Sequence, residues 1–364
     1  MRNQAVTITK AIGIILMVMD HASTGMRQLN IPIELFHMPL FFIMSGFCFN
    51  ASNNIDFLTY VKKKLKGIWW PFVKYCTLFL ILHNLFYSIG FFNDNIGFRG
   101  QGVPAYSVRD YIIIFASNVL FMNKADILLG GYWFLHTLFW SSLLTYLIIT
   151  YANKYHEHKS VWIITTAVLL LLGGAIMTSG FNLRIPLLDI GCKELMATSF
   201  MLAGYLIRQN IAKISFLLNS VYFDVFSVVL LVMGSLFWAT SMIGHQTEYI
   251  LPYFITAITS TMLIYKISTH IENNNERLVS FYTYIGDRTL EILTWHFLCF
   301  KIVSLLIIYI YNANYEIVAE HPIIQEYAHR GWWLAYLITG LVVPLFIEWV
   351  TTKITSYIRV KLIR

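Results

Sequence analysis

The residues with the clearest chemical potential lie near the start of the chain, in the apolar stretch KAIGIILMVMDHASTGM at 10–26. Lys10 and His21 are eleven residues apart, so an α-helix would place both side chains on one face, about 16 Å apart. Asp20 precedes the histidine, and His37 stands at the mouth of the next apolar run. An ionisable group in a membrane helix costs about 3 kcal/mol to insert, so we expect this face to line a bundle interior or a wet cavity.

Other polar residues interrupt later apolar runs. The stretch GDRTLEILTWHFLCF carries Glu291 about a turn and a half before His296. His83 and His136 stand alone in their runs. A single histidine in a membrane helix is about as often a structural hydrogen-bond partner of a neighbouring helix as it is a functional residue. For His37, His83 and His136 the structural role is therefore an alternative.

The amino-acid composition indicates what kind of protein carries these residues. Of the 364 residues, 57% are hydrophobic and only 12% are charged, whereas soluble domains are about one quarter charged. The four cysteines are far apart and form no CxxC pair, which is typical of small buried apolar residues rather than metal ligands. The basic residues form no nucleic-acid surface. The sequence therefore predicts an integral membrane protein of the all-α class without a metal site.

Runs of about 20 apolar residues predict membrane-crossing helices. We expect about ten, over 11–27, 36–50, 68–91, 131–151, 160–178, 192–207, 221–241, 250–267, 289–311 and 332–352. The shorter stretch 110–122 is expected to lie at the interface or to re-enter the membrane. The first run resembles a signal peptide in outline, but its ionisable pair and the lack of a small-x-small cleavage site favour a retained span.

Charge orients these helices. With both termini cytoplasmic, sixteen of the 26 lysines and arginines fall in inner segments and seven in outer ones, as the positive-inside rule requires. Residues 1–364 show no linker or repeat and are expected to form one domain. The polar segment 92–109 is expected to form a lip over an outer entrance, and the basic tail 353–364 to lie on the inner leaflet.

Five motifs occur in a recognisable order: the Lys10–His21 spacing, FHMPLFFIMSGF, a basic cluster followed by WWPF, YWFL, and IGDRTLEILTWHF. This pattern covers nearly the whole chain and resembles the acyltransferase family 3 membrane proteins, especially their fucose-O-acetylase-like branch. The resemblance implies transfer of an acyl group, commonly acetyl from acetyl-CoA, to sugar hydroxyls of bacterial surface glycans. It also implies a multi-pass protein of the bacterial cytoplasmic (inner) membrane.

Site residues follow by position. The first-span histidine of the family corresponds to His21, and its basic partner to Lys10, where many members have arginine. A cytoplasmic arginine pair corresponds to Lys63 and Lys66, although lysine lacks the bidentate fork of arginine. His37 and His296 also match family positions. An Asp or Asn often found just before the basic residue is absent, since Ile8 and Thr9 stand there.

Acyl transfer from a thioester to an alcohol requires a base, and a histidine is suited to this at neutral pH. We expect His21 to be the base, while Asp20 points about 100° away and serves another helix. The predicted catalytic set is therefore His21, Asp20, His37, His296 and Glu291. The predicted acetyl-CoA phosphate site is Lys10, Lys62, Lys63 and Lys66. Tyr132 and Trp133 are candidates for stacking on a sugar, with packing as the alternative.

Two other functions remain open at this stage. A membrane exporter of a surface polysaccharide would share the spans and buried polar groups, but it usually shows repeated halves with broken helices. A sensor or scaffold would not need the Lys10–His21 stripe. The acceptor sugar and hydroxyl, the acyl chain length, direct transfer against a covalent acyl-enzyme, and assembly into a homo-oligomer are left undetermined.

Overall fold

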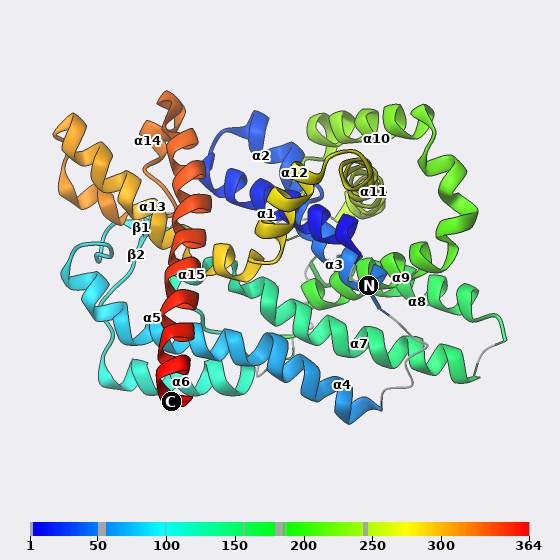
Figure 1. The fold of residues 1–364 in the computed structure, drawn as a ribbon, viewed down its shortest axis with the longest axis horizontal. Helices are drawn as coiled ribbons and strands as arrows, with labels where there is room; N and C mark the ends of the chain where they lie inside the picture. Colours follow the sequence, from blue (N-terminus) through cyan, green and yellow to red (C-terminus); the bar gives the residue numbers. More distant parts are fainter. Residues whose placement is uncertain are drawn as a thin grey trace.

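The computed structural model describes residues 3–49, 56–98, 100–155, 157–178, 185, 188–242 and 247–363, with side chains described as far as residue 357. These residues form a helical membrane bundle with one small β-hairpin (Figure 1). The first half contains α1 (Gln4–Ala22), α2 (Arg27–Glu34), α3 (His37–Phe47), α4 (Phe57–Lys64), η1 (Leu65–Trp69), α5 (Trp70–Ser88), β1 (Gly97–Phe98), β2 (Gln101–Gly102), α6 (Val108–Phe121), η2 (Ile127–Tyr132), α7 (Trp133–Tyr155) and α8 (Lys159–Thr178). The second half contains α9 (Cys192–Leu218), α10 (Val221–Met233), η3 (Gly234–Trp238), η4 (Thr247–Tyr249), α11 (Ile250–Asn274), α12 (Glu276–Gly286), α13 (Thr289–Tyr311), η5 (Tyr315–Ala319), α14 (Gln325–Tyr327), η6 (Ala328–Trp332) and α15 (Trp333–Ile363).

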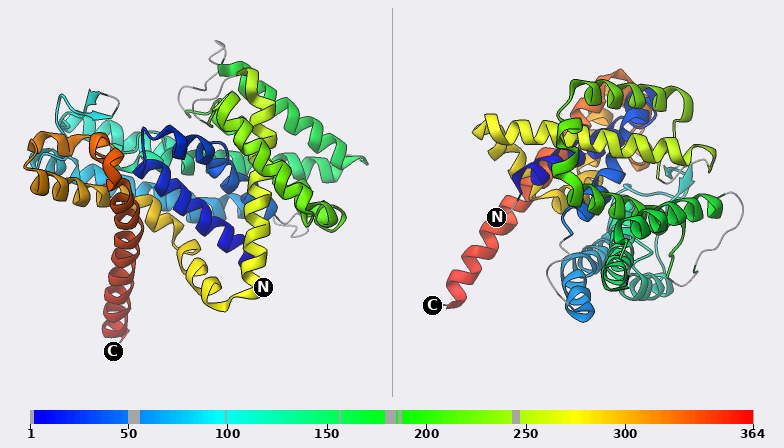
Figure 2. Two further views of the ribbon diagram at one scale, coloured as in Figure 1. Left: turned by 90° about the horizontal axis from the view of Figure 1, so that it is seen from above. Right: turned by 90° about the vertical axis from the view of Figure 1, so that its right-hand side faces the viewer.

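The expected membrane helices are present with shifted ends. Within the part of the chain that the structure describes, nine helical segments are long and apolar enough to cross a membrane. They are Gln4–Ala22, Arg27–Phe47, Phe57–Ser88, Ile127–Tyr155, Lys159–Ile176, Val221–Trp238, Ile250–Asn274, Thr289–Tyr311 and Gln325–Tyr357. The expectation of an all-α, multi-pass bundle is thus confirmed. In the left view of Figure 2 both labelled chain ends lie toward the lower side of the molecule.

The sixth of the ten expected runs, 192–207, differs from the others. It belongs to α9, a 27-residue helix that carries Lys193, Glu194 and Arg208 and is not among the segments apolar enough to cross a membrane. Neighbouring helices enclose its first half, over 192–207, because α9 packs against α3, α7 and α8, whereas the part from Arg208 onward is largely exposed. Buried inside protein, the first half does not need the apolar outer surface that lipid would demand.

Close packing of α3 against α9 holds the centre of the bundle together. A Cβ atom on Gly46 would collide with the backbone oxygen of Met201, and one on Gly204 would collide with the backbone oxygen of Ile43. Small residues at such positions let two helix backbones approach closely, which is a common way to join membrane helices.

Two ends of the bundle matter for function. α1 and α3 pack against each other. His37 begins α3 near the C-terminal end of α1, where His21 lies in the last turn. At the opposite end, Cys48 follows α3 and interacts electrostatically with Lys10. The two helices therefore run in opposite directions between a histidine-containing end and a basic end.

Two peripheral segments differ from a plain bundle. α6, over the stretch expected at the interface, is a 14-residue helix packed against α5 and too short to span. The basic tail continues α15 without a break to Ile363, and this helix projects beyond the rest of the molecule (Figure 2). The tail is thus the end of the last helix rather than a separate surface segment.

Candidate active site

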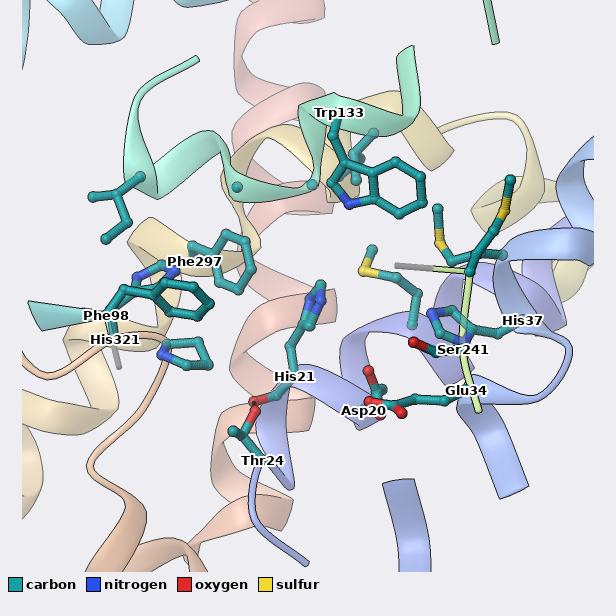
Figure 3. Close-up of a pocket in the computed structure, with 18 residues that line it drawn as sticks. Asp20, His21, Thr24, Glu34, His37, Phe98, Trp133, Ser241, Phe297 and His321 are labelled. Carbon is teal, nitrogen blue, oxygen red and sulfur yellow. Dashed lines mark hydrogen bonds between the residues drawn. The ribbon is translucent and has the colours of Figure 1, made fainter. Parts of the chain in front are cut away.

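A cavity of about 450 Å³ lies beside the last turn of α1. It is lined by helix ends and connecting segments that are far apart in sequence. Figure 3 shows His21 in the middle, with Asp20, Glu34 and His37 on one side and Phe98, Phe297 and His321 on the other. The complete lining is Met17, Asp20, His21, Thr24, Glu34, His37, Met38, Phe98, Ile127, Gly130, Gly131, Trp133, Ser241, Met242, Leu293, Phe297, His321 and Pro322.

The imidazole of His21 is held by the fully buried His296 of α13. Nδ1 of His21 lies 3.1 Å from Nε2 of His296, and the two rings are stacked with an interplanar angle of 11°. Nδ1 of His296 lies 3.0 Å from the backbone oxygens of both Ile292 and Leu293. These residues belong to the turn of α13 that precedes His296, so the helix itself fixes the orientation of its ring.

This arrangement determines where the protons sit. A carbonyl oxygen only accepts, so Nδ1 of His296 must carry hydrogen and donate it. In the neutral ring Nε2 of His296 is then an acceptor, and it receives the Nδ1–H of His21. The remaining nitrogen of His21, Nε2, keeps a free lone pair. A histidine whose second nitrogen is fixed by a hydrogen bond in this way is arranged to act as a base.

Asp20 is connected to α2 rather than to the imidazole of its neighbour. The amide nitrogen of Asn30 donates to the Asp20 carboxylate at 2.9 Å, to its backbone oxygen at 2.7 Å and to the Ser23 hydroxyl at 3.1 Å. Asn30 therefore joins the end of α1 to α2. Asp20 lines the cavity and serves a second helix, as its position next to His21 indicated.

His37 enters the same cavity from the start of α3. Its Nδ1 donates to the backbone oxygen of Ile33 at 2.9 Å, so in the neutral ring Nε2 is an acceptor. Glu34 lines the cavity one turn earlier. Together with Asp20 these residues make one side of the cavity polar and acidic.

The wall opposite His21 is formed by η2 and the first residue of α7. The hydroxyl groups of Tyr132 and Thr294 lie 2.6 Å apart, which ties η2 to α13. Gly130, Gly131 and Trp133 line the cavity from this wall, and the Trp133 ring faces His21 across it (Figure 3). Tyr132 itself is fully buried, so of the two predicted stacking residues only Trp133 is open to a ligand.

Aromatic rings close the other side. Phe297 packs between two imidazoles, with its ring centroid 4.7 Å from His21 and 4.6 Å from His321. Phe98 of β1 forms a backbone bridge to His321 and also lines the cavity. The polar segment 92–109 thus contributes a hairpin to the cavity wall.

The predicted catalytic residues divide into two groups. His21, Asp20 and His37 line the cavity, and His296 supports His21 from behind. Glu291 stands apart, because it is half-buried at the start of α13 and is not among the cavity residues. The backbone oxygens of Ile292 and Leu293, rather than a carboxylate, orient His296.

The predicted cofactor-binding lysines lie away from the cavity, toward the basic end of the bundle. Lys10 is half-buried there. The exposed Arg208 of α9 lies at the same end, since both cations interact electrostatically with Cys48. Burial raises the pKa of the Cys48 thiol, and the two cations act in the opposite direction. Arg208 lies over the ring of Phe47, 5.3 Å from its centroid.

Aromatic contacts bring the lysine-rich helix to this same end. The Phe49 ring, just after α3, lies 6.1 Å from Tyr60 of α4 and 5.9 Å from Tyr205 of α9. The next residues along α4 and η1 include the exposed side chains of Lys62, Lys63 and Lys66. The chain thus gathers positive charge at the end of α1 that is distant from His21.

The two isolated histidines have structural partners. His83 pairs with Asp126 at 2.6 Å and approaches the backbone oxygen of Pro104 at 3.1 Å. His136 approaches the backbone oxygen of Leu188 at 2.9 Å and Glu194 at 3.3 Å. Neither lines the cavity that contains His21.

Sequence reasoning missed several cavity residues, above all His321, Glu34, Phe98 and Phe297. The one available signal for His321 was a histidine in the polar segment between the last two apolar runs, which is weak by itself. Sequence reasoning also missed Arg208, which lies near Cys48 together with Lys10. Among the described residues, no group of three or more His, Cys, Asp or Glu side chains is placed to hold a metal ion.

Comparison with known families identifies the family of the chain. Residues 3–349 match the family model described as an acyltransferase domain, and the chain therefore belongs to acyltransferase family 3. It is a multi-pass membrane acyltransferase that uses an acyl donor and an acceptor. No curated protein and no solved structure matches the chain.

Proposed function

We propose that the chain is an O-acyltransferase of the bacterial inner membrane. It moves an acetyl group from cytoplasmic acetyl-CoA to a hydroxyl of a cell-surface or lipid-linked glycan, with His21 as the general base. The observation that carries this proposal is the His21–His296 hydrogen bond, which leaves a lone pair on His21 Nε2 beside a 450 Å³ cavity. The family membership makes acyl transfer the reaction that such a base would serve.

The proposed reaction follows from this geometry. The acceptor hydroxyl gives its proton to Nε2 of His21 while its oxygen attacks the thioester carbonyl carbon. The tetrahedral intermediate then collapses, the carbon–sulfur bond breaks, and the imidazolium returns the proton to the leaving thiolate. Free coenzyme A and the O-acyl ester are the products. In the His21 imidazolium both ring nitrogens donate, so the bond to His296 Nε2 persists through the cycle.

The basic end is the proposed phosphate site of the donor. Lys10 and Arg208 lie close to Cys48, and the exposed Lys62, Lys63 and Lys66 follow Tyr60 on the adjacent helix. Lys10 lies about 16 Å along α1 from His21. An extended pantetheine arm can cover such a separation, with phosphates among the cations and the thioester at the imidazole.

The cavity walls suit a sugar acceptor. Carboxylates and a histidine face one side, and Trp133 offers an aromatic surface across from His21. Sugars present hydroxyl groups around an apolar ring face, so the combination of carboxylates and an aromatic ring matches their chemistry.

The test uses radiolabelled acetyl-CoA and membranes containing the wild-type chain or His21→Ala. The expected result is label on a surface glycan for wild type and a loss of about 100- to 10,000-fold for the variant. His270→Ala, an exposed histidine on α11, is the matched control and should retain full activity. Wild-type label transfer by His21→Ala would refute the base assignment. Comparison of glycans from wild-type and deletion strains identifies the acceptor.

A second test addresses the donor site. Replacing Lys63 and Lys66 by alanine should raise the KM for acetyl-CoA and weaken its dependence on salt, because the proposed contacts are ionic. The control is Lys353→Ala, an exposed lysine in the last helix. An unchanged KM and salt dependence would exclude both lysines from the phosphate site.

A further inference from the structure

His321 is a cavity residue without an evident structural role. It lies between η5 and α14 and lines the cavity that contains His21. Its Nδ1 is buried and forms no hydrogen bond within the described part of the chain. His37, His83 and His136 each use a ring nitrogen to bind a neighbouring group. A buried polar atom left unpaired is costly, so its retention calls for an explanation.

The segment that carries His321 is firmly held. Lys301, which is only 1% exposed, donates from Nζ to the backbone oxygen of Val318 at 2.7 Å and to that of Glu320 at 2.8 Å. Glu320 directly precedes His321. A buried ammonium on α13 thus fixes the backbone on which the imidazole is mounted.

The ring is also enclosed on two faces. Phe297, one turn before Lys301, packs between His321 and His21, with its ring tilted against both imidazoles. Phe98 approaches the His321 ring with centroids 5.9 Å apart. Both aromatic residues line the cavity. The imidazole therefore has a defined position relative to the base, with Phe297 as the spacer.

The surroundings also keep the ring uncharged. Burial lowers the pKa of His321 well below its ordinary value, and the positive charge of Lys301 and the neighbouring His296 act in the same direction. A neutral imidazole has one N–H donor and one lone pair. A hydroxyl group, which both donates and accepts, can use either.

We propose that His321 is a substrate-binding residue that hydrogen-bonds a second hydroxyl of the acceptor, and that Lys301 is the residue that positions it. Phe297 separates the two imidazoles, so His321 contacts a hydroxyl other than the one that His21 deprotonates. The acceptor is accordingly a polyol that carries two hydroxyl groups on opposite sides of the Phe297 ring, one for His21 and one for His321. This inference rests on the proposed function and adds an acceptor-recognition residue to it.

The experiment separates acceptor binding from donor chemistry. Purified chain in lipid nanodiscs receives labelled acetyl-CoA and surface glycan extracted from a strain that lacks the chain. Transfer to glycan is measured against glycan concentration, and slow hydrolysis of acetyl-CoA by water is measured without glycan. The variants are His321→Phe, His321→Gln and Lys301→Met, with His329→Ala, an exposed histidine on η6, as control.

For His321→Phe we expect about a tenfold increase in the glycan concentration at half-maximal rate, as for the loss of one hydrogen bond. The KM for acetyl-CoA and its rate of hydrolysis should stay within about twofold of wild type. His321→Gln, whose amide both donates and accepts, should recover part of the loss. Lys301→Met should shift the same glycan parameter, and its retained hydrolysis rate shows that the fold persists.

Two results would overturn the inference while leaving the proposed function intact. One is glycan transfer by His321→Phe with wild-type half-saturation. The other is a parallel fall of transfer and hydrolysis in His321→Phe, which would assign the residue to the donor or to the fold. By contrast, a wild-type chain that transfers no label to this glycan would remove the proposed function itself.

Discussion

The hydrogen bond between His21 and His296 permits a quantitative test of the proposed base. The perturbation is His296→Phe, which keeps a planar ring in a fully buried position but removes the acceptor nitrogen. His21 then loses the partner that holds its Nδ1–H, and the lone pair is no longer fixed on Nε2. His296→Gln is the companion variant, because its amide oxygen can accept the same hydrogen.

The magnitude follows from the contact. A neutral hydrogen bond is worth about 0.5 to 1.5 kcal/mol, which corresponds to roughly 2- to 13-fold in rate. General-base catalysis contributes about 100- to 10,000-fold. We therefore expect His296→Phe to lower kcat by about tenfold, His21→Ala by at least 100-fold, and the KM values for both substrates to change little.

The double variant gives the sharpest result. If His296 acts only through His21, then His21→Ala with His296→Phe will be no slower than His21→Ala alone. The assay is initial-rate transfer of labelled acetyl to glycan, with circular dichroism to verify helix content. Losses that multiply in the double variant would show that His296 acts independently and would refute the reasoning.

Three further predictions concern stability. Gly46→Ala should destabilise the bundle by about 1–3 kcal/mol through overpacking against Met201, measured as thermal unfolding in detergent. Gly67→Ala, whose Cβ meets no atom within 4 Å, is the control, and an equal loss of stability in that variant would contradict the packing explanation. Asp126→Asn breaks the buried pair with His83 and should cost about 3 kcal/mol or more in the same assay; an unchanged midpoint would mean that the pair contributes no net stability. The pKa of His321 is lowered in the folded chain, so as pH falls below 6.5 only the unfolded chain takes up a proton at this residue. The contribution of His321 to the free energy of unfolding is therefore retained above pH 6.5 and falls by about 1.4 kcal/mol at pH 5.5. His321→Phe should weaken this pH dependence, and identical stability curves for the variant and wild type would argue against a lowered pKa.

The sequence predicted the class of fold because a helix that crosses a membrane needs a run of about 20 apolar residues, and such runs are visible in the sequence itself. It also predicted that Lys10 and His21 share a helix face, since that depends only on the period of the helix. The run 192–207 shows where this reasoning fails. The first half of α9, which contains this run, is surrounded by other helices. Its hydropathy therefore reflects contact with protein, and a hydropathy scale for lipid-facing helices does not identify it.

The site was predictable only in part, for a related reason. His21, Asp20 and His37 are near one another in sequence and stand out from apolar surroundings. His321 and Phe98 come from connecting segments, and only tertiary contacts bring them to the cavity. Glu291 shows the limit of closeness in sequence, because it lies near His296 along the chain but is not among the cavity residues, and the backbone oxygens of α13 orient the His296 ring.

The burial of α9 has a consequence for how the protein is made. The first half of α9 carries Lys193 and Glu194 and is enclosed by α3, α7 and α8, so it has little to gain from entering lipid before those neighbours are present. During synthesis α3, α7 and α8 emerge from the ribosome first. They can form the protein-lined groove into which α9 settles, so assembly of this region depends on the order in which its helices appear.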